Sequence, residues 1–181
     1  MFIWLIVIVV VVLLVVGMFN GLVRARNLVK NSFADIDVQL KRRYDLVPNL
    51  VETVKGYMKQ ESGVLEAVTN ARAQAQSAGG NLANRATAEN NLGHAITGIF
   101  AVAENYPQLR SSENFQQLQS QLSSLENDIQ SARRYYNAAV REYNNKIQVF
   151  PNNIFAGMLG FGAEQPFGAD ETERQNVQVK F

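Results

Sequence analysis

Residues 1–19 read MFIWLIVIVVVVLLVVGMF and contain no charged or strongly polar side chain. A helix of this length is about 28 Å long, close to the hydrocarbon thickness of a bilayer. The segment therefore predicts a transmembrane helix from Phe2 to Phe19. A cleaved signal peptide is the alternative, but it needs a basic start and a small-residue cleavage site, whereas the first basic residue here is Arg24. These features favour an uncleaved anchor.

Basic residues flank the apolar segment only on its C-terminal side. Arg24, Arg26 and Lys30 all precede the first acidic residue, Asp35. Under the positive-inside rule, the basic flank faces the cytoplasm. We therefore expect a single-pass protein of the cell membrane, with the N-terminus outside and the C-terminal domain in the cytoplasm.

Beyond the anchor, apolar residues recur at spacings of three and four, and alternating strand patterns are absent. The pattern predicts an all-α fold, in which the transmembrane helix continues into an antiparallel up-down-up-down four-helix bundle of long helices. Asp45 can cap the second helix and Pro48 is tolerated in its first turn, so the first reversal is predicted at residues 44–47.

Turn residues and prolines predict the other helix ends. Residues 77–81 form a turn by composition, and the third helix should stop at Pro107. Ser111 or Ser112 can cap the fourth helix, which keeps heptad spacing until Pro151. Sustained heptads raise the alternative of a coiled coil, but short turns between amphipathic segments favour an intramolecular bundle.

The predicted organisation is an anchor over residues 1–19, a bundle over residues 20–162 and a tail over residues 163–181. The last residues of the tail, 170–181, are polar and expected to be mobile. About 160 residues follow the anchor, which suits one compact domain.

Composition and motifs exclude most catalytic classes. The formal net charge is +1, there is no cysteine, and His94 is the one histidine. Nucleic acid is not expected as a partner without a clustered basic face, and disulfides and thiolate metal sites are excluded. His94 has no acid or nucleophile beside it, and no G-x-S-x-G or H-E-x-x-H motif occurs. We expect no enzymatic activity, no cofactor, no metal and no small-molecule substrate.

The first and third turns of this topology lie together at the membrane-distal end. The first carries two arginines and an aromatic residue that a turn does not need, so we predict that this end docks a protein partner. The candidate contacts are Arg42, Arg43, Tyr44, Asn49, Tyr106 and Arg110. The pair Arg133 and Arg134 lies in mid-helix instead, where we expect it to pair with acids such as Glu126 or Asp37 across helices.

Residues 150–167 are strongly apolar and carry one charged residue, Glu164. Two interpretations stay open. The segment forms a lid over the end of the bundle, or it is an interfacial membrane anchor, although it lacks the Lys and Arg that such helices usually carry. The candidate membrane-interface residues are Phe155, Met158, Leu159 and Phe161.

Residues 36–57, IDVQLKRRYDLVPNLVETVKGY, strongly resemble the signature of the LemA family. Further similar motifs are AENYP at 103–107 and RRYYN at 133–137, and the resemblance runs from about Asn20 to Phe161. Tyr44 stands where the family usually has His. The resemblance implies an N-terminally anchored bacterial protein with a cytoplasmic antiparallel helical bundle and no established enzymatic activity. One branch of the family occurs in magnetosome-forming bacteria and is linked to membrane organisation.

The leading hypothesis is a non-enzymatic, membrane-anchored scaffold or interaction protein that forms a homo-oligomer at the inner face of the cytoplasmic membrane. The alternative is an accessory or adaptor subunit of a membrane enzyme complex such as a protease. The expected partners are the lipid bilayer, further copies of the chain and, under the alternative, another membrane protein.

Overall fold

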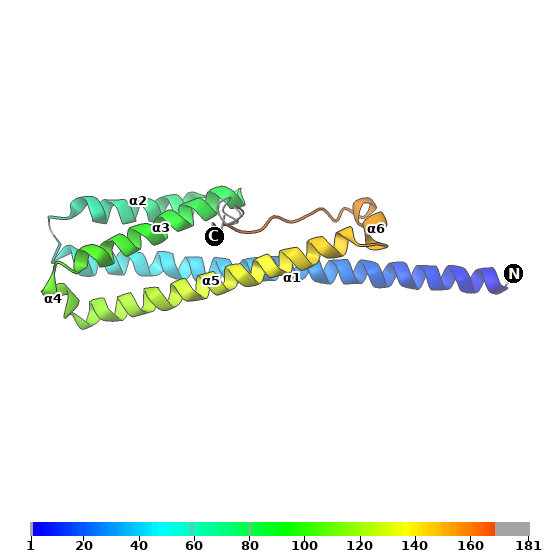
Figure 1. Cartoon of the computed structure of the whole chain (residues 1–181), viewed down its shortest axis with the longest axis horizontal. Coiled ribbons are helices and arrows are strands. Elements are labelled where there is room, and N and C mark those ends of the chain that lie inside the picture. Colours follow the sequence, from blue (N-terminus) through cyan, green and yellow to red (C-terminus); the bar gives the residue numbers. More distant parts are fainter. Residues whose placement is uncertain (1, 59, 80, 169–181) are drawn as a thin grey trace, which may run out of the picture. The chain divides into compact units, whose positions relative to one another are not determined.

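A computed structural model describes residues 2–58, 60–79 and 81–168, and these residues form helices and connections without a strand (Figure 1). The helices are α1 (Phe2–Lys55), α2 (Ser62–Ser77), α3 (Leu82–Ala103), α4 (Pro107–Arg110), α5 (Glu113–Gln148) and α6 (Asn152–Met158). The predicted all-α class is confirmed. The expected mobility of residues 170–181 falls outside the described residues.

The first part of α1 has the length and composition of a membrane-spanning helix. An 18-residue window reaches a mean hydropathy of 3.4, and none of this window is buried. Trp4, for example, is 73% exposed. The helix continues to Lys55 without a break, so the prediction that the apolar helix runs on into the rest of the chain is confirmed.

The predicted first reversal at residues 44–47 is wrong, because α1 passes through Asp45 and Pro48 and the chain turns only after Lys55. A proline inside a helix has no N–H to donate to the carbonyl four residues earlier, here that of Tyr44. The Nε of Arg72 on α2 donates to this carbonyl at 2.7 Å. Arg72 thus replaces the missing hydrogen bond, and α1 continues.

Most of the other predicted helix ends are confirmed. The turn after α2 ends at Asn81, whose side-chain oxygen accepts from the N–H of Ala83 at 2.9 Å and caps α3. Ser112 directly precedes α5, and α5 ends before Pro151. The third helix was expected to continue to Pro107, but α3 already ends at Ala103 and Pro107 is the first residue of α4. Local signals were sufficient for the other ends.

The described residues divide into two compact units. The first unit comprises residues 2–35 and 134–166, and the second comprises residues 36–133 with 167 and 168. Both α1 and α5 contribute to each unit.

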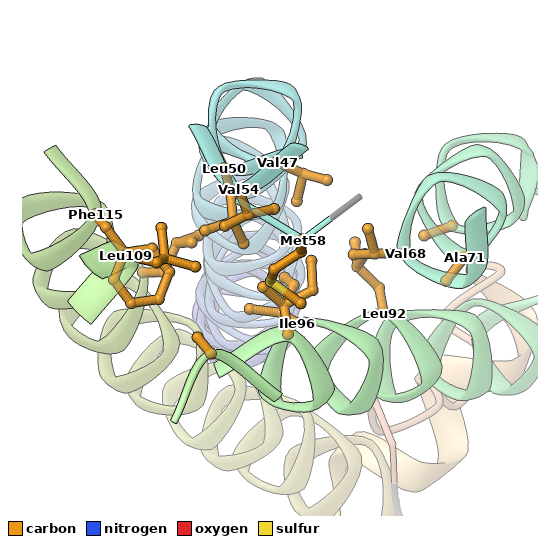
Figure 2. Packing of buried hydrophobic residues seen from close by; sticks show 14 residues of the cluster. Val47, Leu50, Val54, Met58, Val68, Ala71, Leu92, Ile96, Leu109 and Phe115 are labelled. Atoms are coloured by element: carbon orange, nitrogen blue, oxygen red, sulfur yellow. The ribbon is translucent and has the colours of Figure 1, made fainter. Parts of the chain in front are cut away.

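The second unit has a continuous hydrophobic core (Figure 2). Its members lie three, four or seven residues apart on each of the longer helices, as expected for buried helix faces. They are Val47, Leu50, Val54 and Met58 from α1 and the residues after it, Val68, Ala71 and Ala75 from α2, Leu92, Ile96, Ile99 and Ala103 from α3, Leu109 from α4, and Phe115 and Leu122 from α5.

The connection after α1 and the connection after α3 meet in the second unit, as the topology predicted. Tyr106 Oη donates to the carboxylate of Glu61 at 3.4 Å, and Met58 and Leu109 are both fully buried in the core. The residues of the first connection differ from those predicted, because α1 extends past Pro48.

In the first unit, the chain after α6 runs back along α5. Side chains of α5 hold this returning segment by hydrogen bonds to its backbone, which satisfies carbonyl groups that have no helical partner. The bonds run from Tyr136 Oη to the carbonyl of Gln165 (2.8 Å), from Tyr143 Oη to that of Gly162 (2.9 Å) and from Asn144 Nδ2 to that of Glu164 (2.9 Å).

Candidate functional sites

A buried charge cluster lies in the second unit around Arg43. The side chain of Arg43 is 4% exposed, and it donates to the carboxylate of Glu89 and, at 3.0 Å, to that of Glu126. The Glu89 side chain is 2% exposed and also accepts from Tyr44 Oη. A buried carboxylate is costly without partners, so Arg43 and Tyr44 together account for the burial of Glu89.

The phenol of Tyr44 is held in its protonated form. Burial raises its pKa, and the hydrogen bond to the Glu89 carboxylate raises the pKa further. Tyr44 Oη also lies 3.4 Å from the backbone carbonyl of Ala75 on α2. Tyr44 therefore donates its hydroxyl proton to Glu89 of α3 and also contacts the backbone of α2.

A cavity of about 410 Å³ adjoins the charge cluster between α1, α3 and α5. Its charged wall contains Arg43, Glu89 and Glu126, and its apolar wall contains Phe100 and Leu122. The exposed His94 lies on the same lining, together with Arg133. Within the described part of the chain, no group of three or more His, Asp or Glu residues is arranged to hold a metal ion.

Arg43 is buried, which corrects its expected position at an exposed turn. In a continuous helix, adjacent residues point about 100° apart. Arg43 consequently points into the charge cluster with Tyr44 beside it, whereas Arg42 is exposed. Arg43 is therefore not available as a surface contact, and Tyr44 is only partly so.

The remaining predicted docking residues lie in two places. Arg42 and Asn49 are exposed and seven positions apart on α1, so they share one helix face. Tyr106 is half-buried beside Glu61 in the connection before α4, and Arg110 is exposed at the end of α4. Sequence periodicity would have paired Arg42 with Asn49 if Pro48 had not been taken as a helix start.

The exposed face of α1 borders a groove, which we call the α1/α5 groove. It consists of two adjoining hollows of about 460 and 250 Å³ that share Gln121. The part of α1 from Arg42 to Thr53 that lines it is about 16 Å long. The first hollow is lined by Arg42, Asp45 and Leu46 of α1 with Gln121, Ser124, Leu125 and Asp128 of α5, and the second by Thr53 with Asn114, Gln117, Leu118 and Gln121.

The predicted acid–base pairing is found with different partners. Glu126 pairs with Arg43, and Asp37 pairs with Arg85. Arg133 instead places its guanidinium over the ring of Phe167, 5.1 Å from the ring centroid. The acids were correctly expected to pair across helices, but helix spacing alone did not identify the arginines.

Two of the predicted membrane-interface residues pack inside the first unit. Phe161 is 7% exposed, and its ring centroid lies 5.8 Å from that of Phe19. The guanidinium of Arg26 lies 6.0 Å from the same ring. Phe155 is half-buried. Phe161 is therefore enclosed by protein, and Phe155 is partly enclosed.

The other two predicted interface residues are exposed. Met158 is 82% exposed and Leu159 is 44% exposed. They are accompanied by Phe150 at 77% and Ile154 at 53%, which were not among the predicted interface residues. The spacing of four between Ile154 and Met158 was the signal that would have placed these two residues on one face of α6.

Comparison with known proteins identifies the relatives of this chain. The model of the LemA family matches residues 32–181. Protein LemA of Metamycoplasma hominis is 26% identical over 164 residues, which are 91% of this chain and 75% of that protein. Magnetosome protein MamQ 2 of Paramagnetospirillum magneticum is 32% identical over 80 residues, covering 44% of this chain and 29% of that protein.

Magnetosome protein MamQ of Magnetospirillum gryphiswaldense is 24% identical over 153 residues, covering 71% of this chain and 56% of that protein. The chain therefore spans less than two thirds of the length of either magnetosome protein. The family model, in contrast, covers most of the chain, including the buried cluster around Arg43 and the α1/α5 groove. The chain belongs to the LemA family.

Proposed function

We propose that this protein is a non-enzymatic, membrane-anchored scaffold that associates with further copies of itself. The observation that carries the proposal is the continuity of α1 from Phe2 to Lys55. One helix supplies an exposed apolar segment and also the core residues Val47, Leu50 and Val54. The membrane anchor and the folded unit are thus parts of the same element.

The basic residues after the apolar segment support a cytoplasmic position for the second unit. Arg24 and Lys30 are exposed on α1, and Arg26 lies between them. Under the positive-inside rule, this flank stays in the cytoplasm and the N-terminus lies outside. The shared core of α1, α2, α3 and α5 supports an antiparallel, up-down-up-down four-helix arrangement on that side.

The α1/α5 groove is the surface that we propose for self-association. Copies anchored in one membrane present α1 in the same direction, so a two-fold axis along the membrane normal brings like faces together. Arg42 and Asp45 lie almost one turn apart on that face, and each can meet the opposite charge of the second copy. The exposed parts of Leu46 and Leu118 provide apolar contact beside these charges.

The mass of the purified full chain in mild detergent tests this proposal. We expect a homo-oligomer that Arg42→Glu converts largely to monomer, while Ser120→Glu, at an exposed position outside the groove lining, leaves it intact. The double variant Arg42→Glu with Asp45→Arg exchanges the two charges and should restore association. A monomeric protein would overturn self-association, and a monomer that co-purifies with another membrane protein would favour the adaptor alternative.

A further inference from the structure

We propose that α6 is a second membrane contact, whose exposed apolar face enters the boundary between headgroups and acyl chains beside α1. The inference rests on the proposed anchoring by α1 and adds a second element to it. All of the residues involved lie within the first unit.

Exposed apolar side chains lie on α6 and directly before it, and we call them the apolar stripe. Ile154 and Met158 are four residues apart on α6 and therefore lie on one helix face, Phe150 stands two residues before the helix, and all three are more than half exposed. The opposite side contains Ala156, which is buried at 3% exposure. Large apolar residues clustered on one side of a short helix indicate a surface that is covered by another apolar phase.

The position of α6 along α1 identifies that phase as the bilayer. A cavity of about 390 Å³ is lined by Leu13, Leu14, Gly17, Met18, Gly21 and Leu22 of α1 together with Lys146 and Asn152. The end of α5 and the start of α6 therefore lie beside the last turns of the apolar segment. Leu13 is six residues before Phe19, which places it about 9 Å inside the apolar edge. Interfacial helices enter the bilayer to a similar depth of about 5–10 Å.

The chain returning from α6 is fixed at the same level. The ring of Phe161 contacts that of Phe19, the last residue of the apolar segment, at 5.8 Å between centroids. The guanidinium of Arg26 lies 6.0 Å from the centroid of the Phe161 ring, and its Nε is 3.8 Å from the carboxylate of Glu164. These contacts tie the segment after α6 to the point where α1 leaves the hydrocarbon.

The charges near α6 are compatible with insertion. Residues 149–163 contain no charged side chain, so no ionised group of this segment has to enter the hydrocarbon. Lys146 lines the cavity beside Leu13 and Leu14, and its ammonium lies 2.8 Å from the carboxylate of Glu142. A lysine at this depth can direct its ammonium toward the headgroups. The basic residues that α6 lacks are supplied by the exposed Arg24 and Lys30 of α1.

Site-directed spin labelling of the full chain in vesicles tests the inference, because the protein has no cysteine of its own. A nitroxide is attached at Met158→Cys, with Val11→Cys as the label inside the anchor and Ala138→Cys as an exposed label on α5 of the same unit. Collision rates with oxygen and with a water-soluble nickel chelate are measured in phosphatidylcholine, with and without phosphatidylglycerol.

We expect the label at residue 158 to collide more often with oxygen than with the nickel chelate. Its depth in the bilayer should lie between the depths of the labels at residues 11 and 138. Because the stripe is uncharged, the depth should be the same in both lipid compositions. Adding Phe150→Ser and Ile154→Ser should move the label toward water. Met158 is 82% exposed, so its substitution leaves the fold intact, which far-ultraviolet circular dichroism verifies.

The outcomes separate this inference from the proposed anchoring. If the label at residue 158 is as accessible to the nickel chelate as that at residue 138 while residue 11 is embedded, α6 is not a membrane contact and the anchor stands. If residue 158 is shielded from both reagents, protein covers α6 and the inference is overturned. If residue 11 is accessible to the nickel chelate, the anchor fails and the inference fails with it.

Discussion

The hydrogen bond from Arg72 to the carbonyl of Tyr44 should stabilise the protein because Pro48 leaves this carbonyl without a helical partner. Replacing Arg72 by Met keeps much of the side-chain volume but removes the donor that lies 2.7 Å from this carbonyl. In the natural sequence the carbonyl then has no helical partner, because Pro48 has no N–H. In a Pro48→Ala background the alanine N–H occupies the helical position and donates to the same oxygen.

The expected magnitudes differ between the two backgrounds. An unpaired backbone carbonyl in a buried site costs about 1–3 kcal/mol, and Arg72 is half-buried, so we expect Arg72→Met to cost about 1–2 kcal/mol in the natural sequence. With Pro48→Ala the same change should cost about 0.5 kcal/mol, from lost packing alone. The interaction free energy between the two positions should thus be about 1 kcal/mol, which double-mutant cycles resolve.

Urea unfolding of the four proteins in detergent, followed by circular dichroism at 222 nm, measures these free energies. Pro48→Ala alone should stabilise the protein, since proline is about 3 kcal/mol less favourable than alanine inside a helix. Lys41→Met, a change of an exposed basic residue of α1 that lies outside the groove lining, is the control and should have an effect below about 0.5 kcal/mol. Equal costs of Arg72→Met in both backgrounds would refute the explanation of how α1 continues through Pro48.

Three further predictions concern the second unit. Arg43→Met should lower the free energy of unfolding by about 3–5 kcal/mol, because it removes the cation that pairs with the buried carboxylate of Glu89. Glu126→Gln should cost at most about 1 kcal/mol, because the Glu126 side chain is 41% exposed. Urea unfolding distinguishes the two variants. The folded-state pKa of Tyr44 lies above the ordinary value of 10.0. The contribution of Tyr44 to the free energy of unfolding is therefore complete below pH 10 and is lost as the pH rises. The free energy of unfolding is measured from pH 9 to 11. Above pH 10 it should fall by about 1.4 kcal/mol per pH unit through Tyr44, and Tyr44→Phe should lack this contribution. Gly168→Ala should lower the melting temperature, because residue 168 has φ of +61° and an added Cβ would collide with the guanidinium of Arg133.

The helix ends that could be predicted from the sequence depend on neighbouring residues only. Asn81 caps α3 through its own side chain, and α5 ends at Gln148, shortly before Pro151. The end of α1 could not be predicted in this way. Its continuation through Pro48 depends on Arg72, which is 24 residues further along the chain and on another helix.

The same reason explains the errors at the candidate sites. Arg43 resembles a surface arginine in sequence, and its burial depends on Glu89, 46 positions away on α3. The burial of Phe161 likewise depends on contacts with Phe19 and Arg26 of α1. Periodicity identified which segments are helical, but the partners of polar side chains are set by contacts between helices.

The continuity of α1 also changes what kind of partner the proposed docking residues can bind. A turn presents its side chains at one end of a helical unit, and it would suit a partner that approaches end-on. Arg42, Asp45 and Asn49 instead follow one another along a single exposed helix face, with the α1/α5 groove beside them. Such a face is complementary to another helix that lies alongside it. Copies anchored in one bilayer can present this face to each other without either leaving the membrane, so lateral self-association requires less reorganisation than end-on capture of a soluble partner.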